Sequence, residues 1–303
     1  MNSPIPDEGE ATDSVGGSQD LIPVDDVADM VESILKVLEP KVNPRPVFSL
    51  SGLRQEQIEK LHLIEGPSLK LITNSRRLDE ECVRGEDPLW SHDTLYRQLC
   101  LLQSSVARTE ASARTFIDSI FYRAAAILSS RSSDGKRVVL GLALPIEATV
   151  GNDEATLKGF VDYAIFYTRN ERALSFMRDP LLSKIRLHSD SVFVSLGHQL
   201  PQSLGEMYAC SSAVNKKIIR GALTNGHSWI FLLLKVHPNG QGGTYSVSQE
   251  ISIMTPGPDY VLEVNSNACA QVSVVLASWI EKSFDDLDSS EWFSPNVQFA
   301  PVS

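Results

Sequence analysis

The pattern of apolar and polar positions is most informative between Leu157 and Thr168. This segment is rich in β-branched and aromatic residues and follows the loop sequence Gly151-Asn152-Asp153, so we expect a β-strand. Side chains alternate between the two faces of a strand, and both faces are apolar here except at Asp162. Such a pattern predicts a central strand covered on both sides. A carboxylate in that position is costly to bury unless it is paired, hydrogen-bonded or bound to a metal.

Apolar residues recur at helical spacing in segments 24–38, 92–104, 107–129 and 267–284. Ser91 can cap the second helix, and Pro201 is a favourable first residue of a further helix that ends near Asn215. Glu110 lies nearly on the same face as the apolar stripe of the third helix. That stripe consists of Ala113, Phe116, Ile117, Ile120, Phe121, Ala124, Ile127 and Leu128.

The remaining pattern predicts further strands and short helices. We expect strands over 69–73, 137–150, 191–196, 217–223, 228–236 and 245–254, short helices over 54–61 and 172–177, and a charged surface loop over 76–88. The turn Thr224-Asn225-Gly226-His227 predicts a hairpin, and strands 137–150 and 157–168 form a second one. This order of elements predicts an α/β (α+β) fold with a mixed central β-sheet flanked by helices.

Composition and cysteine spacing indicate an intracellular protein, cytoplasmic or nuclear. Of 303 residues 42% are hydrophobic, and the longest apolar run, Trp229–Val236, is too short to span a bilayer, so we expect no membrane association. The N-terminus has neither the basic region nor the apolar core of a secretory signal. The four cysteines are scattered, which favours reduced thiols over disulfides or a metal site.

The formal charge of −11 is concentrated at the two ends of the chain. Residues 1–39 carry a net −9 and residues 281–303 a net −4, which leaves +2 for residues 40–280. Residues 1–22 are polar and acidic, so we expect disorder there. Acidic ends on a nearly neutral body do not exclude a nucleic-acid partner, because the local patch decides binding.

Two carboxylates are the main chemical candidates, Glu110 on a long helix and Asp162 on a following strand. Oxygen ligands of this kind hold Mg²⁺, which can activate water and stabilise a phosphoryl transition state. Each also has a structural explanation, since an acid in the first turn of a helix is stabilised by the helix dipole and a strand Asp can bond to backbone amides. Nucleotide-loop, zinc-hydrolase and serine-hydrolase motifs do not occur in the sequence.

Four sequence blocks carry a resemblance to a known family. They begin at Glu110 (EASARTFIDSI), Gly159 (GFVDYAI), Pro201 (PQSLGEMYAC) and Ile219 (IRGALTNGHSWIF). Over about residues 105–285 the chain resembles the fungal PD-(D/E)XK nuclease-like proteins. The order of the blocks is distinctive, although each block is short. The resemblance implies a restriction-endonuclease-like fold and an ancestral Mg²⁺-dependent hydrolysis of phosphodiesters.

The resemblance also implies particular site residues. Glu110 matches the helix Glu and Asp162 the strand Asp of the family, both catalytic and metal-binding, and Gln202 matches the catalytic helix Gln. The family's Glu-x-Lys does not match, because the strand that should carry it runs from Val194 almost directly into the helix at Pro201. A metal-ligating acid and the charge-stabilising Lys are therefore missing. Losing one such positioned group costs on the order of 10²–10³ in rate.

Three explanations of this gap stay open. The domain is degenerate and kept for binding, or Lys184, Glu206 or His198 has taken over the missing roles, or a short coding segment was lost from the gene model at Val194. We favour a degenerate nuclease-like domain, inactive or severely impaired, with Mg²⁺ binding weakened or lost and with nucleic acid or protein as partner. The alternatives are an active Mg²⁺-dependent nuclease with migrated residues and a protein–protein interaction scaffold.

The resemblance divides the chain into four parts. These are a disordered acidic N-terminus (1–22), an accessory mostly helical region (23–104), the nuclease-like core (105–285) and a C-terminal tail (286–303). Within the core we expect an ion pair between Arg114 and Glu110, four residues apart on one helix. Trp229 and Phe231 are predicted to be core residues. The basic group Lys216, Lys217 and Arg220 is predicted to lie on a solvated turn.

Overall fold

The structure is a computed structural model that describes residues 45–83, 89–106, 109–131, 135–151, 154–168, 196–257 and 261–295. Residues 46–303 form one compact unit, and the boundaries at residues 104 and 285 that the sequence suggests lie inside it. Three predicted segments, the helices over 24–38 and 172–177 and most of the strand over 191–196, lie outside the described residues.

The largest sheet has five strands. Its order is β2 (Leu63–Glu65), β8 (Gly243–Val247), β7 (Ser228–Val236) and β6 (Ile218–Thr224), and β9 (Ile251–Ser252) also pairs with β7. The β2–β8 pair is parallel and the others are antiparallel, so the sheet is mixed. The predicted β6–β7 hairpin is confirmed. Its turn needs a glycine, because Gly226 has a φ of 86°.

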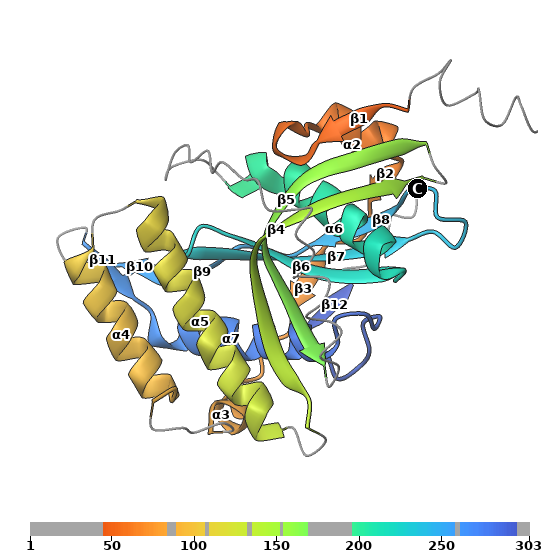
Figure 1. Cartoon of the computed structure of the whole chain (residues 1–303). Helices are drawn as coiled ribbons and strands as arrows, with labels where there is room; N and C mark the ends of the chain where they lie inside the picture. The colour runs from red at the N-terminus through yellow and green to blue at the C-terminus, as the bar shows by residue number, and fades with distance from the viewer. Residues whose placement is uncertain are drawn as a thin grey trace, which may run out of the picture. The chain divides into compact units, whose positions relative to one another are not determined.

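Strand β7 separates two hydrophobic clusters, which lie on opposite faces of this sheet. Trp229 and Phe231 are both 0% exposed and face the first cluster, as predicted, whereas Leu232 and Leu234 face the second. Helices α5 (Glu110–Arg131) and α7 (Ser266–Glu281) supply most of the first cluster, and α6 (Leu200–Val214) supplies much of the second. Figure 1 shows α6 on one side of the sheet and α7 on the other.

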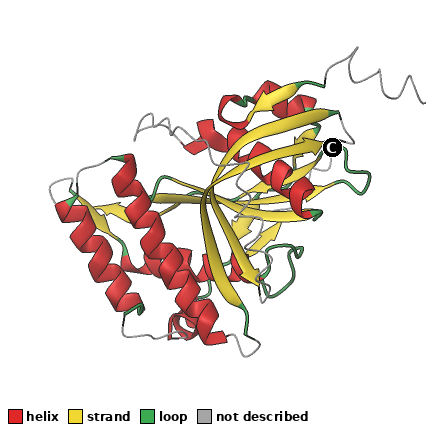
Figure 2. Cartoon of the chain, viewed as in Figure 1, coloured by secondary structure: helices red, strands yellow, loops and turns green. Residues whose placement is uncertain are grey.

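A long hairpin joins the two clusters. The predicted strand is β5 (Ala155–Thr168), which pairs with β4 (Arg137–Val150) along its length. On its other edge β1 (Val47–Ser49) pairs only with residues 156–158, so the expectation of a central strand covered on both sides holds only for the start of β5. The half of the hairpin near its turn packs against the α6 cluster, while residues such as Tyr163 and Ile165 in the other half pack against the α5 cluster. Figure 2 shows the paired strands running between the helices.

The remaining elements complete the mixed architecture. Helix α4 (His92–Ser105) is capped as predicted, since the Ser91 hydroxyl accepts from the Thr94 N–H at 3.1 Å. The expected strand over 245–254 is divided between β8, β9 and β10. The other elements are α2 (Gln55–Lys60), α3 (Ser75–Val83), the paired strands β3 (Leu69–Leu71) and β12 (Phe293–Pro295), the paired strands β10 (Met254–Pro256) and β11 (Leu262–Val264), and the 3₁₀ turns Leu50–Gly52 and Leu196–Gln199.

The predicted fold class is confirmed, because mixed sheets are flanked by helices. One local prediction of secondary structure is wrong. Much of the expected loop over 76–88 is helix α3, whose Leu78 and Cys82 pack on the first cluster. The C-terminal segment contributes Trp292 and Phe293, exposed by 2% and 1%, to the same cluster. None of the helices in the described ranges is both long and apolar enough to cross a membrane.

Candidate functional site

Of the three residues that the sequence singles out, Glu110 and Asp162 are linked through Arg114, and Gln202 is connected to Asp162 only through Glu206. Glu110 is the first residue of α5, Asp162 lies in the middle of β5, and Gln202 is in the first turn of α6. Local capping places Glu110, because the Thr109 hydroxyl accepts from the Ser112 N–H at 3.2 Å and starts the helix there. The structural explanation of Glu110 as a first-turn acid is therefore confirmed.

Arg114 connects Glu110 to Asp162. Its Nη2 atom is 3.0 Å from Glu110 Oε1 and 3.9 Å from Asp162 Oδ1. The first contact confirms the predicted pair along the helix. The second contact joins helix α5 to strand β5 and was not predicted, although the spacing of Glu110, Arg114 and Asp118 at every fourth residue marks a polar stripe on α5. A guanidinium thus lies between the two candidate metal ligands.

Asp162 is not the buried carboxylate that the strand pattern predicts, since 64% of its side chain is exposed. Directly opposite on β4, Ala143 has a φ of 48°, and the ladder pairs the residues on either side but not these two. A left-handed residue at this point interrupts the regular pairing beside Asp162. The departure from the predicted burial therefore coincides with a local distortion of the hairpin.

Surrounding protein shifts the proton affinity of Asp162. Loss of solvation raises the pKa of this carboxyl above its ordinary value, Arg114 opposes the shift, and the Glu110 carboxylate adds to it. Because most of the side chain is exposed, solvent screens these interactions, and we expect them to contribute little to stability.

Glu206 adds a third carboxyl to the site. Its Oε1 atom accepts a hydrogen bond from Gln202 Nε2 at 2.8 Å, one helical turn away on α6. Burial raises the pKa of Glu206 to about 8, the Gln202 bond opposes the shift, and the nearby Asp162 carboxylate adds to it. Glu206 is therefore mostly protonated at neutral pH, and the hypothesis that it faces this site is supported by its interaction with Asp162.

Two neighbouring groups are unsuited to nucleophilic chemistry. Burial, followed by the proximity of Glu206, raises the pKa of the Cys210 thiol to about 12, so the reactive thiolate is scarce. Tyr163, next to Asp162 on β5, donates its hydroxyl to Asp118 Oδ1 at 3.1 Å. Burial and the Asp118 carboxylate raise the pKa of Tyr163 well above its ordinary value.

Among the described residues, no hydrogen bond or ion pair links the other candidates to the site. His198 is exposed in the 3₁₀ turn Leu196–Gln199. Lys184 lies outside the described residues, as does the segment before Leu196 in which a Glu-x-Lys was sought.

The described residues are a poor match for Mg²⁺. A magnesium site needs oxygen ligands around a free position, but the Arg114 guanidinium contacts both Glu110 and Asp162. Within the described ranges, no three His, Cys, Asp or Glu side chains are grouped so that they could hold a metal ion. The arrangement is an ion-paired polar cluster with one neutral acid beside it.

No model of a known protein family matches the chain, and no curated protein shows significant similarity to it.

Proposed function

We propose that this chain is a non-hydrolytic binding protein built on a PD-(D/E)XK nuclease-like domain, in which an arginine has taken the place of the metal ion. The observation that carries the proposal is the position of Arg114 between Glu110 and Asp162. The link between Glu110 on α5 and Asp162 on β5, with the Gln202–Glu206 pair of α6 near Asp162, supports the resemblance on which it rests.

An arginine supplies the positive charge of a metal ion but not its chemistry. A guanidinium keeps its proton at any physiological pH, so it can act neither as a base nor as a site for activated water. A metal ion lowers the pKa of bound water and polarises a phosphoryl oxygen, and the described residues offer no replacement for either effect. The cluster therefore links α5 to β5 by an exposed ion pair and presents a polar surface without hydrolytic groups.

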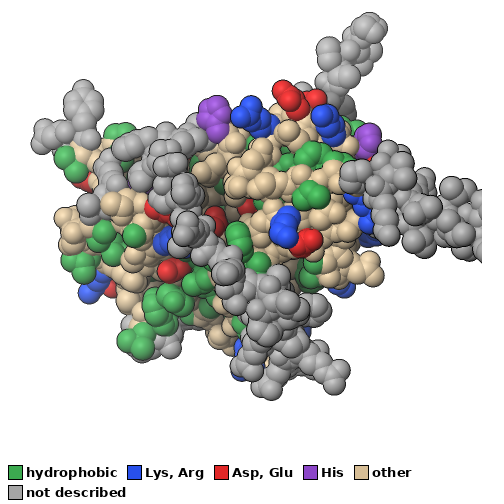
Figure 3. All heavy atoms as spheres, turned by 45° about the horizontal axis from the view of Figure 1, so that its top comes forward, with side chains coloured by type: hydrophobic (Ala, Val, Ile, Leu, Met, Phe, Trp, Pro, Cys, Tyr) green, Lys and Arg blue, Asp and Glu red, His purple; other side chains and the backbone are tan. Residues whose placement is uncertain are grey.

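The charge of the site favours a protein over a nucleic acid as the partner. With Glu206 neutral, Glu110 and Asp162 still outnumber the single guanidinium of Arg114. Phosphate backbones are bound by clustered Lys and Arg side chains. On the face drawn in Figure 3 the described basic side chains are scattered among acidic ones and do not form one continuous patch.

Glu206 supports a second candidate, an active nuclease with a migrated acid. The Asp162 carboxylate adds to the raised pKa of Glu206, so the two side chains are near enough to interact, although the described residues do not group three such side chains around one metal position. This candidate requires Asp162-dependent cleavage.

A cleavage assay separates the two candidates. Single- and double-stranded DNA and RNA are incubated with the full chain in Mg²⁺ or Mn²⁺, beside Asp162→Asn and a control, Glu147→Gln, which alters an exposed carboxylate on β4. We expect the wild type and Asp162→Asn to give the same amount of cleavage, with none that depends on Asp162. Cleavage that is lost in Asp162→Asn and kept in Glu147→Gln would overturn the proposal.

The partner class is tested by fluorescence anisotropy with labelled DNA and RNA. We expect that neither Arg114→Ala nor Asp162→Asn changes any binding of the chain to DNA or RNA. Binding to DNA or RNA that is weakened by Arg114→Ala would mean that the site recognises nucleic acid, against the proposed protein partner.

A further inference from the structure

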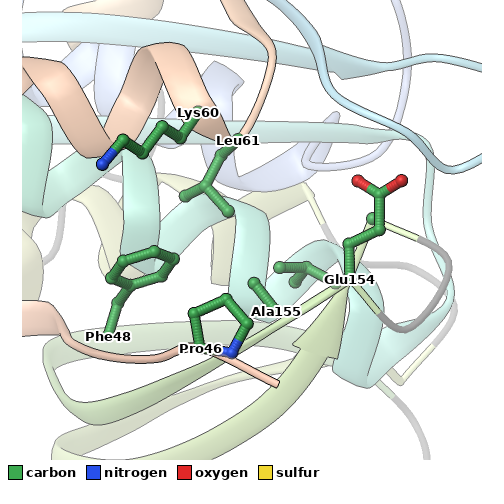
Figure 4. A pocket seen from close by; sticks show the side chains of 8 residues that line it. Pro46, Phe48, Lys60, Leu61, Glu154 and Ala155 are labelled. Carbon is green, nitrogen blue, oxygen red and sulfur yellow. The ribbon is translucent and has the colours of Figure 1, made fainter. Parts of the chain in front are cut away.

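A half-open cleft lies between β1, the end of α2, the end of β4 and the start of β5. Its cavity volume is about 340 Å³. Leu61, Val150 and Ala155, exposed by 6%, 3% and 4%, form its apolar floor together with the partly buried Phe48. Figure 4 shows Phe48, Leu61 and Ala155 between two charged side chains, Lys60 on one side and Glu154 on the other.

The two charged side chains are not equivalent. The Glu154 carboxylate already accepts a hydrogen bond at Oε1 from Gln241 Nε2 at 3.1 Å. Lys60 is exposed, and within the described residues its ammonium has neither an ion pair nor a hydrogen bond. Glu154 keeps its negative charge, so the cleft has an anionic and a cationic rim, and Lys60 is the charged lining group whose side chain has no protein partner among the described residues.

This cleft is separate from the cluster around Asp162. Ala155 and Asp162 lie on the same strand, seven residues apart, which corresponds to about 23 Å along β5. A ligand in the cleft would not touch Arg114 or Glu110, so the inference is independent of the proposed function.

We propose that the cleft binds a small carboxylic acid with an aromatic or branched aliphatic body. The body covers Phe48, Leu61 and Ala155, and the carboxylate pairs with Lys60. The cavity volume of about 340 Å³ is at the small end of ligand sites, which begin at about 300 Å³, so it suits a ligand of this size.

The test uses 3-phenylpropionate and its neutral analogue 3-phenylpropanamide as probes. Binding of each to the full chain is followed by methyl-group NMR, where shifts at Leu61 and Val150 report on the cleft. We expect the acid to bind about threefold to fivefold more tightly than the amide, the advantage of one exposed charge pair. Lys60→Met should remove this difference and Lys60→Arg should keep it. Lys70→Met, an exposed lysine on β3 outside the cleft, should change nothing.

Each result decides the question. The proposal is overturned if the acid leaves the Leu61 and Val150 signals unmoved, if acid and amide bind equally to the wild type, or if Lys60→Met preserves the preference. A preference for the acid that is lost equally in Lys60→Met and Lys70→Met would show that Lys60 makes no specific pair with the carboxylate and would also overturn it. Binding in the cleft does not change the outcome of the cleavage assay, so the two proposals are tested independently.

Discussion

Arg220 and Glu291 form a two-pronged ion pair in which both side chains are fully buried. Arg220 Nη2 is 2.9 Å from Glu291 Oε1, and Nη1 is 3.1 Å from Oε2. The guanidinium also lies 4.6 Å from the ring centroid of Trp279 and donates to the backbone carbonyl of Asp285. The pair fastens β6 to the segment after α7, so the prediction that Arg220 lies on a solvated turn is wrong.

Arg220→Met should strongly destabilise the fold. The substitution leaves the Glu291 carboxylate buried, with Lys282 Nζ at 3.2 Å as a partial substitute, and breaking such a pair costs roughly 3–5 kcal/mol. The matched control is Lys235→Met, which removes an exposed pair with Asp286 and should cost less than about 1 kcal/mol. Urea unfolding measures both free energies. Equal losses in the two variants would mean that burial of the Arg220 pair is energetically unimportant.

Glu206→Gln should change how stability depends on pH. The folded protein holds the Glu206 proton up to a pKa of about 8, whereas the ordinary value is 4.5. Between these values the folded state binds more protons than the unfolded state, so the contribution of Glu206 to stability falls as pH rises. The variant should match the wild type near pH 4 and exceed it by roughly 2–4 kcal/mol at pH 8.

Chemical unfolding across this pH range checks the Glu206 prediction. Ser203→Ala, an uncharged substitution on the same helix, is the control and should follow the wild-type pH dependence. If the difference in unfolding free energy between Glu206→Gln and the wild type is the same at every pH from 4 to 8, the assigned protonation of Glu206 is contradicted.

Gly226→Ala should weaken the contact between the β6–β7 turn and α5. Besides its φ of 86°, Gly226 approaches α5 so closely that an added Cβ would lie 2.8 Å from the Ala113 backbone oxygen. We expect a loss of roughly 1–3 kcal/mol, measured by thermal unfolding. Gly52→Ala, where an added Cβ meets nothing within 4 Å, should be nearly neutral. Similar losses at both positions would show that neither the positive φ of Gly226 nor its close approach to α5 determines the effect.

The sequence predicted those elements whose pattern is local. The β6–β7 hairpin follows from Asn225-Gly226 between two apolar strands, and α4 from Ser91 before an apolar helical repeat. Helix α3 was missed because only two of its apolar residues, Leu78 and Cys82, pack on the core and the rest of the segment is charged. Its stability depends on tertiary packing, which a local pattern does not show.

The missed contacts of the site and the core are all long-range. Arg220 stands near Lys216 and Lys217 in the sequence, but its partner Glu291 is 71 residues away. Arg114 was expected to contact Glu110 within its own helix, while its contact with Asp162 depends on how α5 packs on β5. The exposure of Asp162 could not be predicted either, because strand alternation does not reveal a left-handed residue at Ala143.

The central claim, that Arg114 replaces the metal ion, is tested most directly by calorimetric titration of the full chain with Mg²⁺ and Mn²⁺. We expect Asp162→Asn to give the same Mg²⁺ and Mn²⁺ titrations as the wild type, because the wild type has no metal binding that depends on Asp162. Arg114→Ala should uncover Mn²⁺ binding, and adding Asp162→Asn to it should remove that binding again. Tight Mg²⁺ binding to the wild type that disappears in Asp162→Asn would contradict this claim. It would favour a metal-dependent nuclease instead.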